Sequence, residues 1–309
     1  MSPDVRRPFD RVAVSKALSR IASARVADIL NLLAADDTRR ARVVAVTGAP
    51  GAGKSTLIAR LAPYRLRHAR SLAVIAIDPT SPLSGGSVLG DRIRMDALSE
   101  DPRVLIRSLP SRAAEDGLTD NLAEVVATLD MFGFDDVMIE TVGVGQTAYG
   151  ARALADIVVL VLTPGAGDYV QAMKAGIMEV ADAYVINKSD QPGSERLIAE
   201  LSGVLLRVGD KTERPLVQVR AGDDTGIVEL SGVLDQQFAR ASESAVAAAR
   251  RARCRYRVQG LVQRSLKEAL DALPETTWDH PIPGIYQQAI TGLREYAARA
   301  MSIPFRKAK

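Results

Sequence analysis

Short apolar runs alternate with longer amphipathic stretches through the middle of this 309-residue chain. Each run is rich in Val, Ile and Leu with little polar alternation, as expected for a strand buried on both faces of a sheet. Runs of this kind are Val43–Val46, Leu72–Ile77, Val104–Ile106, Val137–Ile139, Ile157–Leu162, Tyr184–Ile186 and Leu216–Val219. The stretches between most of them are long enough for crossover helices. The pattern predicts an α/β fold with a mostly parallel central sheet.

The two ends of the chain have a helical pattern instead. Residues 1–40 carry an apolar stripe at helical spacing, which predicts an N-terminal helical arm. After about Gly226 the strand pattern stops, and we expect a long helix within Ala245–Leu273 and a final helix over Ile285–Met301. The predicted organisation has three parts, namely an arm over 1–40, an α/β domain over 41–235 and a helical extension over 236–309.

The predicted long C-terminal helix has two faces of different character. Its apolar stripe consists of Cys254, Val258, Leu261, Val262, Leu266 and Leu270. Another face carries Arg250, Arg253, Arg257 and Arg264. The apolar seam requires a partner surface, either on a second chain or on the central domain. We expect Cys254 to be a small core residue and the arginine face to be solvated, because no aromatic residues that could stack on bases accompany it.

Composition and charge narrow the class of protein. Forty basic and thirty-seven acidic side chains leave a net charge of +3, which gives no reason to expect a nucleic-acid or membrane partner. No apolar run is long enough to span a bilayer. The single cysteine excludes an intramolecular disulfide framework and suits a reducing compartment. These features predict a globular cytoplasmic protein.

A glycine-rich motif directly follows the first predicted strand. The segment Gly48-Ala49-Pro50-Gly51-Ala52-Gly53-Lys54-Ser55-Thr56 matches the pattern G-x-x-x-x-G-K-S, and a helical run follows from Leu57. Backbone N–H groups of such a loop bind phosphates, with Lys54 reaching the β- and γ-oxygens and Ser55 binding magnesium. The motif predicts a P-loop that binds a nucleoside triphosphate. Kinases, ATPases and GTPases share it, so it leaves the base and the reaction open.

A second motif, Asn187-Lys188-Ser189-Asp190, ends a later predicted strand. A carboxylate at Asp190 can accept hydrogen bonds from N1–H and the exocyclic amine of guanine, whereas adenine leaves it unpaired. We expect Asn187 to fix the loop and approach the N7 and O6 edge of the purine, and the stem of Lys188 to cover the ring. The quartet alone could be a polar turn. Its place at the carboxyl end of a parallel strand predicts guanine selection.

Acidic residues after two other strands are candidate magnesium ligands. Asp78 directly follows the second predicted strand, and Asp91 lies beyond it in a loop rich in Gly and Ser. Glu140 follows the fourth predicted strand. Carboxylates beside a P-loop favour a magnesium site formed by Ser55, Asp78, Asp91 and Glu140. Each of the two aspartates could alternatively cap a helix or a turn.

The candidate catalytic residues are Lys54, Glu140 and Gln146. Glu140 could order the magnesium water shell or the attacking water, Gln146 could orient that water, and the Gly143 N–H could bind the γ-phosphate. No arginine has an evident transition-state role, so we expect slow intrinsic turnover that a partner stimulates. Two other classes remain open: a P-loop kinase acting on a small molecule, and a nucleotide-gated scaffold with negligible turnover.

Together these motifs resemble those of the MeaB/ArgK-type GTPases, the G-protein chaperones of adenosylcobalamin-dependent acyl-CoA mutases. The resemblance spans about Arg42 to Asp190, and the N-terminal helices are also similar. It is carried in order by Gly48–Thr56, Asp78-Pro79, Gly85-Gly86-Ser87, Leu89-Gly90-Asp91, Glu140–Gln146, Pro164–Asp168 and Asn187–Asp190. It implies a P-loop NTPase fold that binds GTP or GDP with Mg²⁺ and hydrolyses GTP.

The resemblance also implies a mechanism and partners. The GTP state would gate adenosylcobalamin loading into the mutase and removal of damaged cobalamin, with Pro164–Lys174 similar to a third switch that faces the mutase. The chain would form a homodimer through the long C-terminal helix. In the fifth guanine-binding segment, Arg220-Ala221-Gly222 replaces the usual Ser-Ala, and the Ala221 N–H could still reach guanine O6.

Several other segments depart from the family pattern. Thr147-Ala148 stands where the family has Ser and an acid, Tyr169 replaces a glutamate, and Gly117–Leu122 lacks the expected Gly-Leu-Gly-Gly. These are segments that face the partner, whereas the nucleotide-facing motifs match. The difference suggests a variant partner, for example a 2-hydroxyisobutyryl-CoA-type mutase rather than methylmalonyl-CoA mutase.

Overall fold

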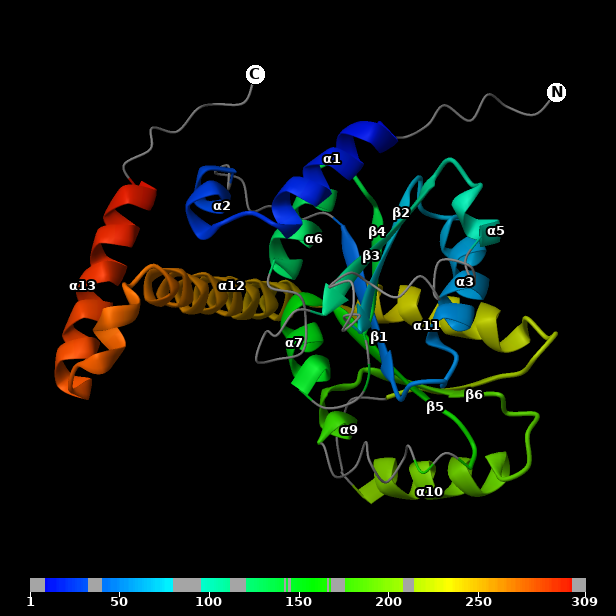
Figure 1. The fold of residues 1–309 in the computed structure, drawn as a ribbon. Coiled ribbons are helices and arrows are strands. Elements are labelled where there is room, and N and C mark those ends of the chain that lie inside the picture. Colours follow the sequence, from blue (N-terminus) through cyan, green and yellow to red (C-terminus); the bar gives the residue numbers. More distant parts are fainter. Residues whose placement is uncertain are drawn as a thin grey trace.

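The structure, a computed structural model, describes residues 9–32, 41–79, 96–111, 121–141, 143, 146–165, 167, 176–207 and 214–301. A seven-stranded sheet forms its centre, with helices on both faces (Figure 1). The strands are β1 (Arg42–Gly48), β2 (Leu72–Pro79), β3 (Val104–Ser111), β4 (Asp136–Glu140), β5 (Ile157–Leu162), β6 (Ala183–Asn187) and β7 (Leu216–Val219). Each predicted apolar run lies inside one of these strands, which confirms the α/β prediction.

The strands lie in the order β3-β2-β4-β1-β5-β6-β7, and every neighbouring pair is parallel. The central strand β1 pairs with β4 on one side, where Val46 lies beside Glu140, and with β5 on the other, where Gly48 lies beside Val161. The carboxyl ends of β1, β2, β4 and β6 therefore meet at one edge, where open parallel sheets bind their ligands.

Two groups of helices bury opposite faces of the sheet. The domain helices are α3 (Lys54–Arg65), α5 (Asp96–Ser99), α6 (Leu122–Met131), α7 (Gln146–Leu154), α9 (Ile177–Val180), α10 (Ser194–Arg207) and α11 (Thr225–Arg240). One core cluster joins α3 and α11 to Val44 and Val46, and another joins α6 and α7 to Val43 and Ala45. A third cluster places α9 and α10 over β5 and β6. Since alternate strand residues face opposite helices, nearly every strand position must be apolar.

The ends of the chain add further helices to this domain. They are α1 (Arg11–Ala22), α2 (Val26–Leu32), α12 (Glu243–Asp271), the 3₁₀ helix η1 (Glu275–Asp279) and α13 (Ile282–Met301). Helix α1 packs on the sheet face with α6, while α12 projects from the domain and α13 lies at its far end beside α2 (Figure 1). Across the described part of the chain, no helix combines the length and apolar character that a bilayer crossing requires.

Polar contacts join α2 to the two C-terminal helices. The Glu268 carboxylate of α12 accepts a hydrogen bond from the Val26 N–H at 3.2 Å and another from the Tyr296 hydroxyl of α13. Both predicted helical extensions are therefore present and in contact. The division into three parts stays a prediction, and the boundary proposed at residue 235 falls inside α11.

Three of the four arginines that were predicted to form a solvated face of α12 pack on the domain instead, while Arg250 is exposed as predicted. Arg257 and Arg264 approach the carboxylate of Glu124 on α6, at 3.2 and 3.5 Å, and Arg253 pairs with Asp156 at 2.9 Å. The Glu124 side chain is only 3% exposed. A carboxylate this deeply buried requires cationic partners, and the arginines of α12 provide them.

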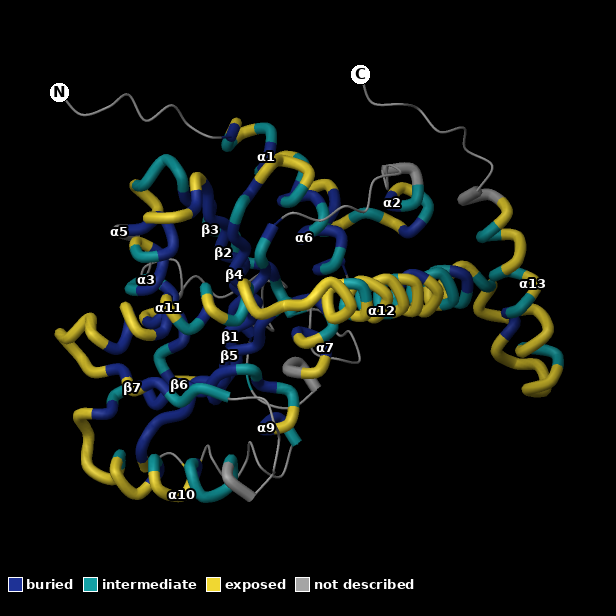
Figure 2. The backbone as a smooth tube through the Cα atoms, turned by 180° about the vertical axis from the view of Figure 1, so that it is seen from behind, coloured by how far each residue is buried: buried dark blue, intermediate teal, exposed yellow. Residues whose placement is uncertain are grey.

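Because these arginines contact the domain, the apolar stripe lies on another face of α12. Cys254 is exposed, so the prediction that it belongs to the core is wrong. Val258 and Val262 are more than half exposed, while Leu261 is buried against α2. Much of α12 is exposed along its length (Figure 2). Periodicity identifies the stripes of a helix, but it does not determine which stripe the neighbouring surface will cover.

A buried ion network closes the edge of the sheet opposite the predicted motifs. The Arg65 side chain, at the end of α3, is fully buried and bonds Asp136 of β4 at 3.0 Å and Asp235 of α11 at 2.7 Å. Its guanidinium also donates to the Ser231 carbonyl at 3.2 Å, and Arg42 bonds the second oxygen of Asp136 at 2.6 Å. The network joins the sheet to both helices on this face.

We expect Arg65→Met to lower the free energy of unfolding by about 3 kcal/mol, because Oδ2 of the buried Asp136 carboxylate loses its cationic partner and only Arg42, on Oδ1, remains. Urea unfolding followed by circular dichroism measures the loss. The matched control is Arg70→Met, because the Arg70 side chain is 83% exposed and pairs with Asp135; we expect it to cost about 0–1 kcal/mol. Equal losses in the two variants would contradict a structural role for the Arg65 network.

Candidate nucleotide-binding site

Strand β1 delivers the glycine-rich loop to the carboxyl edge of the sheet. Its last residue, Gly48, has φ +152°, and a Cβ there would lie 2.3 Å from the Val161 carbonyl oxygen. Only glycine permits this approach. Gly53 closes the loop in the left-handed region at φ +85°, and α3 begins at Lys54 with no side-chain cap among the described residues. A loop that ends at a helix N-terminus in this way is the backbone arrangement that binds phosphate.

The side chain of Lys54 is held over this loop by backbone carbonyl groups of the loop. Its Nζ donates to the carbonyl oxygens of Gly48 and Ala49, both at 3.0 Å, and the residue is 7% exposed. The neighbouring predicted contact residues differ in burial, since Ala52 is buried while Pro50 and Thr56 are exposed. The ammonium group is thus already at the mouth of the loop, where a phosphate would replace the carbonyl oxygens.

Three of the four predicted magnesium ligands lie on adjoining elements. The Ser55 hydroxyl donates to Glu140 Oε1 at 2.7 Å, and both side chains are buried. Asp78, 2% exposed, is the penultimate residue of the neighbouring strand β2, two residues past the register partner of Glu140. Oxygen donors gathered beside a phosphate loop suit magnesium. Asp91 lies outside the described residues.

The segment after Glu140 is tied to β1 by two buried threonines. Thr47 Oγ1 donates to the Gly143 carbonyl at 3.0 Å, and Thr141 Oγ1 donates to Thr47 Oγ1 at 3.0 Å. Neither threonine was among the predicted site residues. The signal was present in the sequence, because Thr47 is a polar residue inside an otherwise apolar strand and buried hydroxyls need partners.

Other predicted elements are only partly described. Gln146 begins α7, and its side chain lies outside the described part, as do the side chains of Thr147 and Ala148. In the predicted third switch, only Pro164, Gly165 and Gly167 fall within the described residues. Tyr169 and most of Gly117–Leu122 also lie outside them.

The Asn-Lys-x-Asp quartet lies directly against the phosphate loop. Asn187 Nδ2 donates to the Ala52 carbonyl at 2.8 Å, and Lys188 Nζ donates to the Gly51 carbonyl at 3.1 Å. Lys188 adopts φ +55°, which side-chain-bearing residues rarely do and which turns the chain at the end of β6. The structure therefore places Asn187 on the loop, and two motifs more than 130 residues apart form one site.

Asp190, the predicted base selector, lies beside the turn that carries Ala221. It is exposed, and its Oδ1 accepts a hydrogen bond from the Ala221 N–H at 3.3 Å. The Asp190 carboxylate and the Ala221 N–H are thus neighbours. Both are predicted to contact guanine. The turn that carries Ala221 joins β7 to α11.

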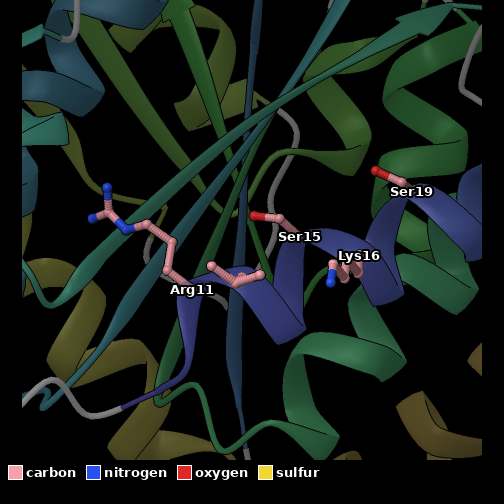
Figure 3. Close-up of a pocket in the computed structure, with 5 residues that line it drawn as sticks. Arg11, Ser15, Lys16 and Ser19 are labelled. Atoms are coloured by element: carbon pink, nitrogen blue, oxygen red, sulfur yellow. The ribbon is translucent and has the colours of Figure 1, made fainter.

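A separate hollow runs along α1. It is open, has a volume of about 420 Å³, and is lined by Arg11, Val12, Ser15, Lys16 and Ser19 (Figure 3). These residues project from a single helix that precedes the sheet domain. None of the motif residues that the structure describes lines this hollow, so the phosphate loop and the quartet define the candidate site.

Comparison with known proteins agrees with this geometry. A sequence profile described as "Methylmalonyl Co-A mutase-associated GTPase MeaB" matches residues 13–275. A protein from Pyrococcus abyssi is 46% identical over 198 residues, which cover 62% of this chain and 61% of that protein. The chain therefore spans less than two thirds of that relative's length.

Two further relatives cover more of the chain. A probable GTPase of Mycobacterium bovis is 36% identical over 235 residues, covering 72% of this chain and 70% of that protein. The mitochondrial methylmalonic aciduria type A homolog of Mus musculus is 34% identical over 246 residues, covering 77% of this chain and 59% of that protein.

Among solved structures, the LAO/AO transport system kinase matches with a TM-score of 0.56 at 22% identity, covering 95% of this chain and 99% of that one. At this identity the likeness supports the fold alone. The family profile extends from within α1 to the first residue of η1 and includes every motif of the candidate site. This chain therefore belongs to the MeaB family of methylmalonyl-CoA mutase-associated GTPases.

Proposed function

We propose that this protein binds GTP at the carboxyl edge of its sheet, hydrolyses it slowly, and uses the nucleotide state to control an adenosylcobalamin-dependent acyl-CoA mutase. The observation that carries the proposal is the direct contact of the Asn187 amide with the Ala52 carbonyl at 2.8 Å. It puts a guanine-selecting motif against a phosphate loop. One nucleotide can then contact both the phosphate loop and the Asn-Lys-x-Asp quartet.

The phosphate chain would bind the loop Gly48–Thr56 through backbone N–H groups and Lys54. The Lys54 ammonium now donates to two neutral carbonyl oxygens. Exchanging these neutral acceptors for anionic β- and γ-phosphate oxygens strengthens the contacts, because attraction between opposite charges is added to the hydrogen bonds of the ammonium group. Lys54 would thus stabilise both the bound nucleotide and the charge that develops on the transferred phosphoryl group.

The residues at the end of β4 suit a magnesium ion. Ser55 and Glu140 bring two oxygens to within 2.7 Å of each other, and Asp78 lies near the end of the adjacent strand β2. In the described part of the chain, no three His, Cys, Asp or Glu side chains gather closely enough to hold a metal by themselves. Phosphate and water oxygens would complete the coordination, as is usual for magnesium. When bound, the ion neutralises charge on the β- and γ-phosphates.

Hydrolysis would use groups just after β4. Glu140 would order a water molecule near the γ-phosphate, and Gln146 would help to orient it. The Thr47 hydroxyl donates to the Gly143 carbonyl at 3.0 Å, which restricts the backbone of Gly143, the residue whose N–H we assign to the γ-phosphate. No nearby arginine has an assigned role, so slow turnover and stimulation by a partner are expected.

The proposed mutase partner and the proposed homodimer are based on membership of the MeaB family. Its profile is named for association with methylmalonyl-CoA mutase, and the mouse relative for methylmalonic aciduria. We extend the proposal to GTP-gated adenosylcobalamin loading and removal of damaged cofactor, in the cytoplasm, by a homodimer. Val258 and Val262 of α12 are more than half exposed and are available for a second copy of the chain.

Replacing the base selector should change the base preference. For Asp190→Asn we expect about a hundredfold loss of GDP affinity, because a charged acceptor for two hydrogen bonds is lost. Titration calorimetry with GDP and ADP measures it. Asp271→Asn removes the same charge from an exposed site on α12 and is the matched control. An Asp190→Asn protein with unchanged GDP affinity would refute the assignment.

Two glycines of the loop allow a matched steric test. A Cβ at Gly53 would lie 2.4 Å from Asn187 Nδ2, whereas one at Gly51 would meet nothing within 4 Å, and both residues have positive φ. Gly53→Ala should therefore lower GDP affinity at least about tenfold more than Gly51→Ala, which bears only the backbone strain of about 1–2 kcal/mol. Equal effects in both variants would show that contact between loop and quartet is unimportant for binding.

A cobalamin-dependent mutase should stimulate GTP turnover. We expect a 2-hydroxyisobutyryl-CoA-type mutase, added at saturating concentration, to raise kcat at least about tenfold and more than methylmalonyl-CoA mutase does. Phosphate release measures the rate, and Lys54→Ala gives the background. If neither mutase binds or changes the rate, the chaperone proposal is wrong.

A further inference from the structure

The turn between β7 and α11 carries part of the proposed base site and is exposed to solvent. Every residue from 220 to 225 is exposed, so apolar burial does not fix the turn. It is tight, with an antiparallel bridge between Arg220 and Asp223 and with Gly222 at φ +70°. Its Ala221 N–H nevertheless meets Asp190 Oδ1 at 3.3 Å. Polar contacts must therefore hold this turn in place.

One side chain of the phosphate-loop helix makes four hydrogen bonds to the turn. Arg60 of α3 donates from Nη1 to the Arg220 carbonyl at 2.7 Å and from Nη2 to the Asp223 carbonyl at 2.5 Å. A single guanidinium thus bridges both ends of the turn. Nη2 and Nε also donate to Asp224 Oδ1, at 2.9 and 3.2 Å.

Tyr64 supports this arrangement one helical turn later. Its hydroxyl donates to Asp224 Oδ2 at 3.0 Å, so both oxygens of that carboxylate are bound to α3. Hydrogen bonding by Arg60, and next by Tyr64, lowers the pKa of Asp224. Residues at positions i and i+4 of a helix lie on the same face, which is why both side chains reach the turn.

The two carbonyl contacts distinguish Arg60 from an ordinary surface ion pair. An exposed pair between Arg60 and Asp224 alone would contribute little. The planar guanidinium has donors in a fixed fork, so it can hold two backbone oxygens at a set separation, whereas the ammonium of lysine is a point charge. Fixing residues 220 and 223 also fixes Ala221 between them.

We propose that Arg60, supported by Tyr64, is a positioning residue for base selection: it holds the turn 220–224 so that the Ala221 N–H and Asp190 are arranged to receive guanine. The inference rests on the proposed guanine site. Helix α3 then has two functions in one nucleotide site, because its first turn binds phosphate through Lys54 and Ser55 and its second turn holds the base-binding turn.

The test compares nucleotides that differ only in the base. For Arg60→Ala we expect GDP affinity to fall about tenfold, the worth of one or two hydrogen bonds, with little change for ADP. The KM for GTP should rise more than kcat falls. Arg60→Lys keeps the charge but not the fork, and should lose guanine affinity to within about twofold of Arg60→Ala.

Two further variants make the test specific. Tyr64→Phe removes one hydrogen bond to Asp224 and should weaken GDP binding about threefold. Arg70→Ala removes another arginine that bonds an aspartate, Asp135, at the opposite edge of the sheet, and should leave the ratio of GDP to ADP affinity unchanged. If Arg60→Ala does not fold, Tyr64→Phe decides the question, and an unchanged GDP affinity in that variant overturns the proposal.

The outcomes separate this inference from the proposed function. If the wild-type protein prefers GDP and loses that preference in Asp190→Asn but keeps it in Arg60→Ala, the base site stands and the role of Arg60 is wrong. The role of Arg60 is also wrong if Arg60→Ala loses GDP and ADP affinity equally, or if Arg60→Lys binds GDP as tightly as the wild-type protein does. A wild-type protein that does not distinguish GDP from ADP overturns both.

Discussion

The hydrogen bond from the Asn187 amide to the Ala52 carbonyl, 2.8 Å long, joins the two halves of the nucleotide site. The halves start on strands that are not neighbours, because β5 separates β1 from β6. The loop can cross β5 since Gly48 has no Cβ to collide with the Val161 carbonyl, and it can meet Asn187 since Gly53 has none either. The contact between phosphate loop and base selector thus depends on two close backbone approaches that only glycine allows.

Helix α3 connects this site to the opposite edge of the sheet. Its N-terminus follows the phosphate loop, Arg60 in its second turn holds the turn after β7, and Arg65 at its end enters a buried ion network with β4 and α11. Removal of such a network leaves uncompensated buried charge, so the far end of α3 is firmly fixed. The helix can therefore set the distance between the phosphate and base contacts.

Much of this architecture could be predicted from the sequence. All seven strands appear as apolar runs, because strands covered on both faces leave almost no polar position, and the strand–loop–helix context identifies the P-loop. The packing of α12 could not be predicted, since Glu124, the buried acid that attracts Arg257, is 133 residues away. Arg60 was missed for the same reason, because Asp224 lies 164 residues further along the chain and no local motif marks the pair.

The most direct test of the account is a calorimetric titration of the purified protein with GDP and then with ADP, in the presence of magnesium. We expect GDP to bind at one site per chain and ADP to bind at least about a hundredfold more weakly, because adenine would leave the Asp190 carboxylate unpaired. Equal uptake of the two nucleotides, or no uptake of either, would contradict a guanine site built from the phosphate loop and the quartet.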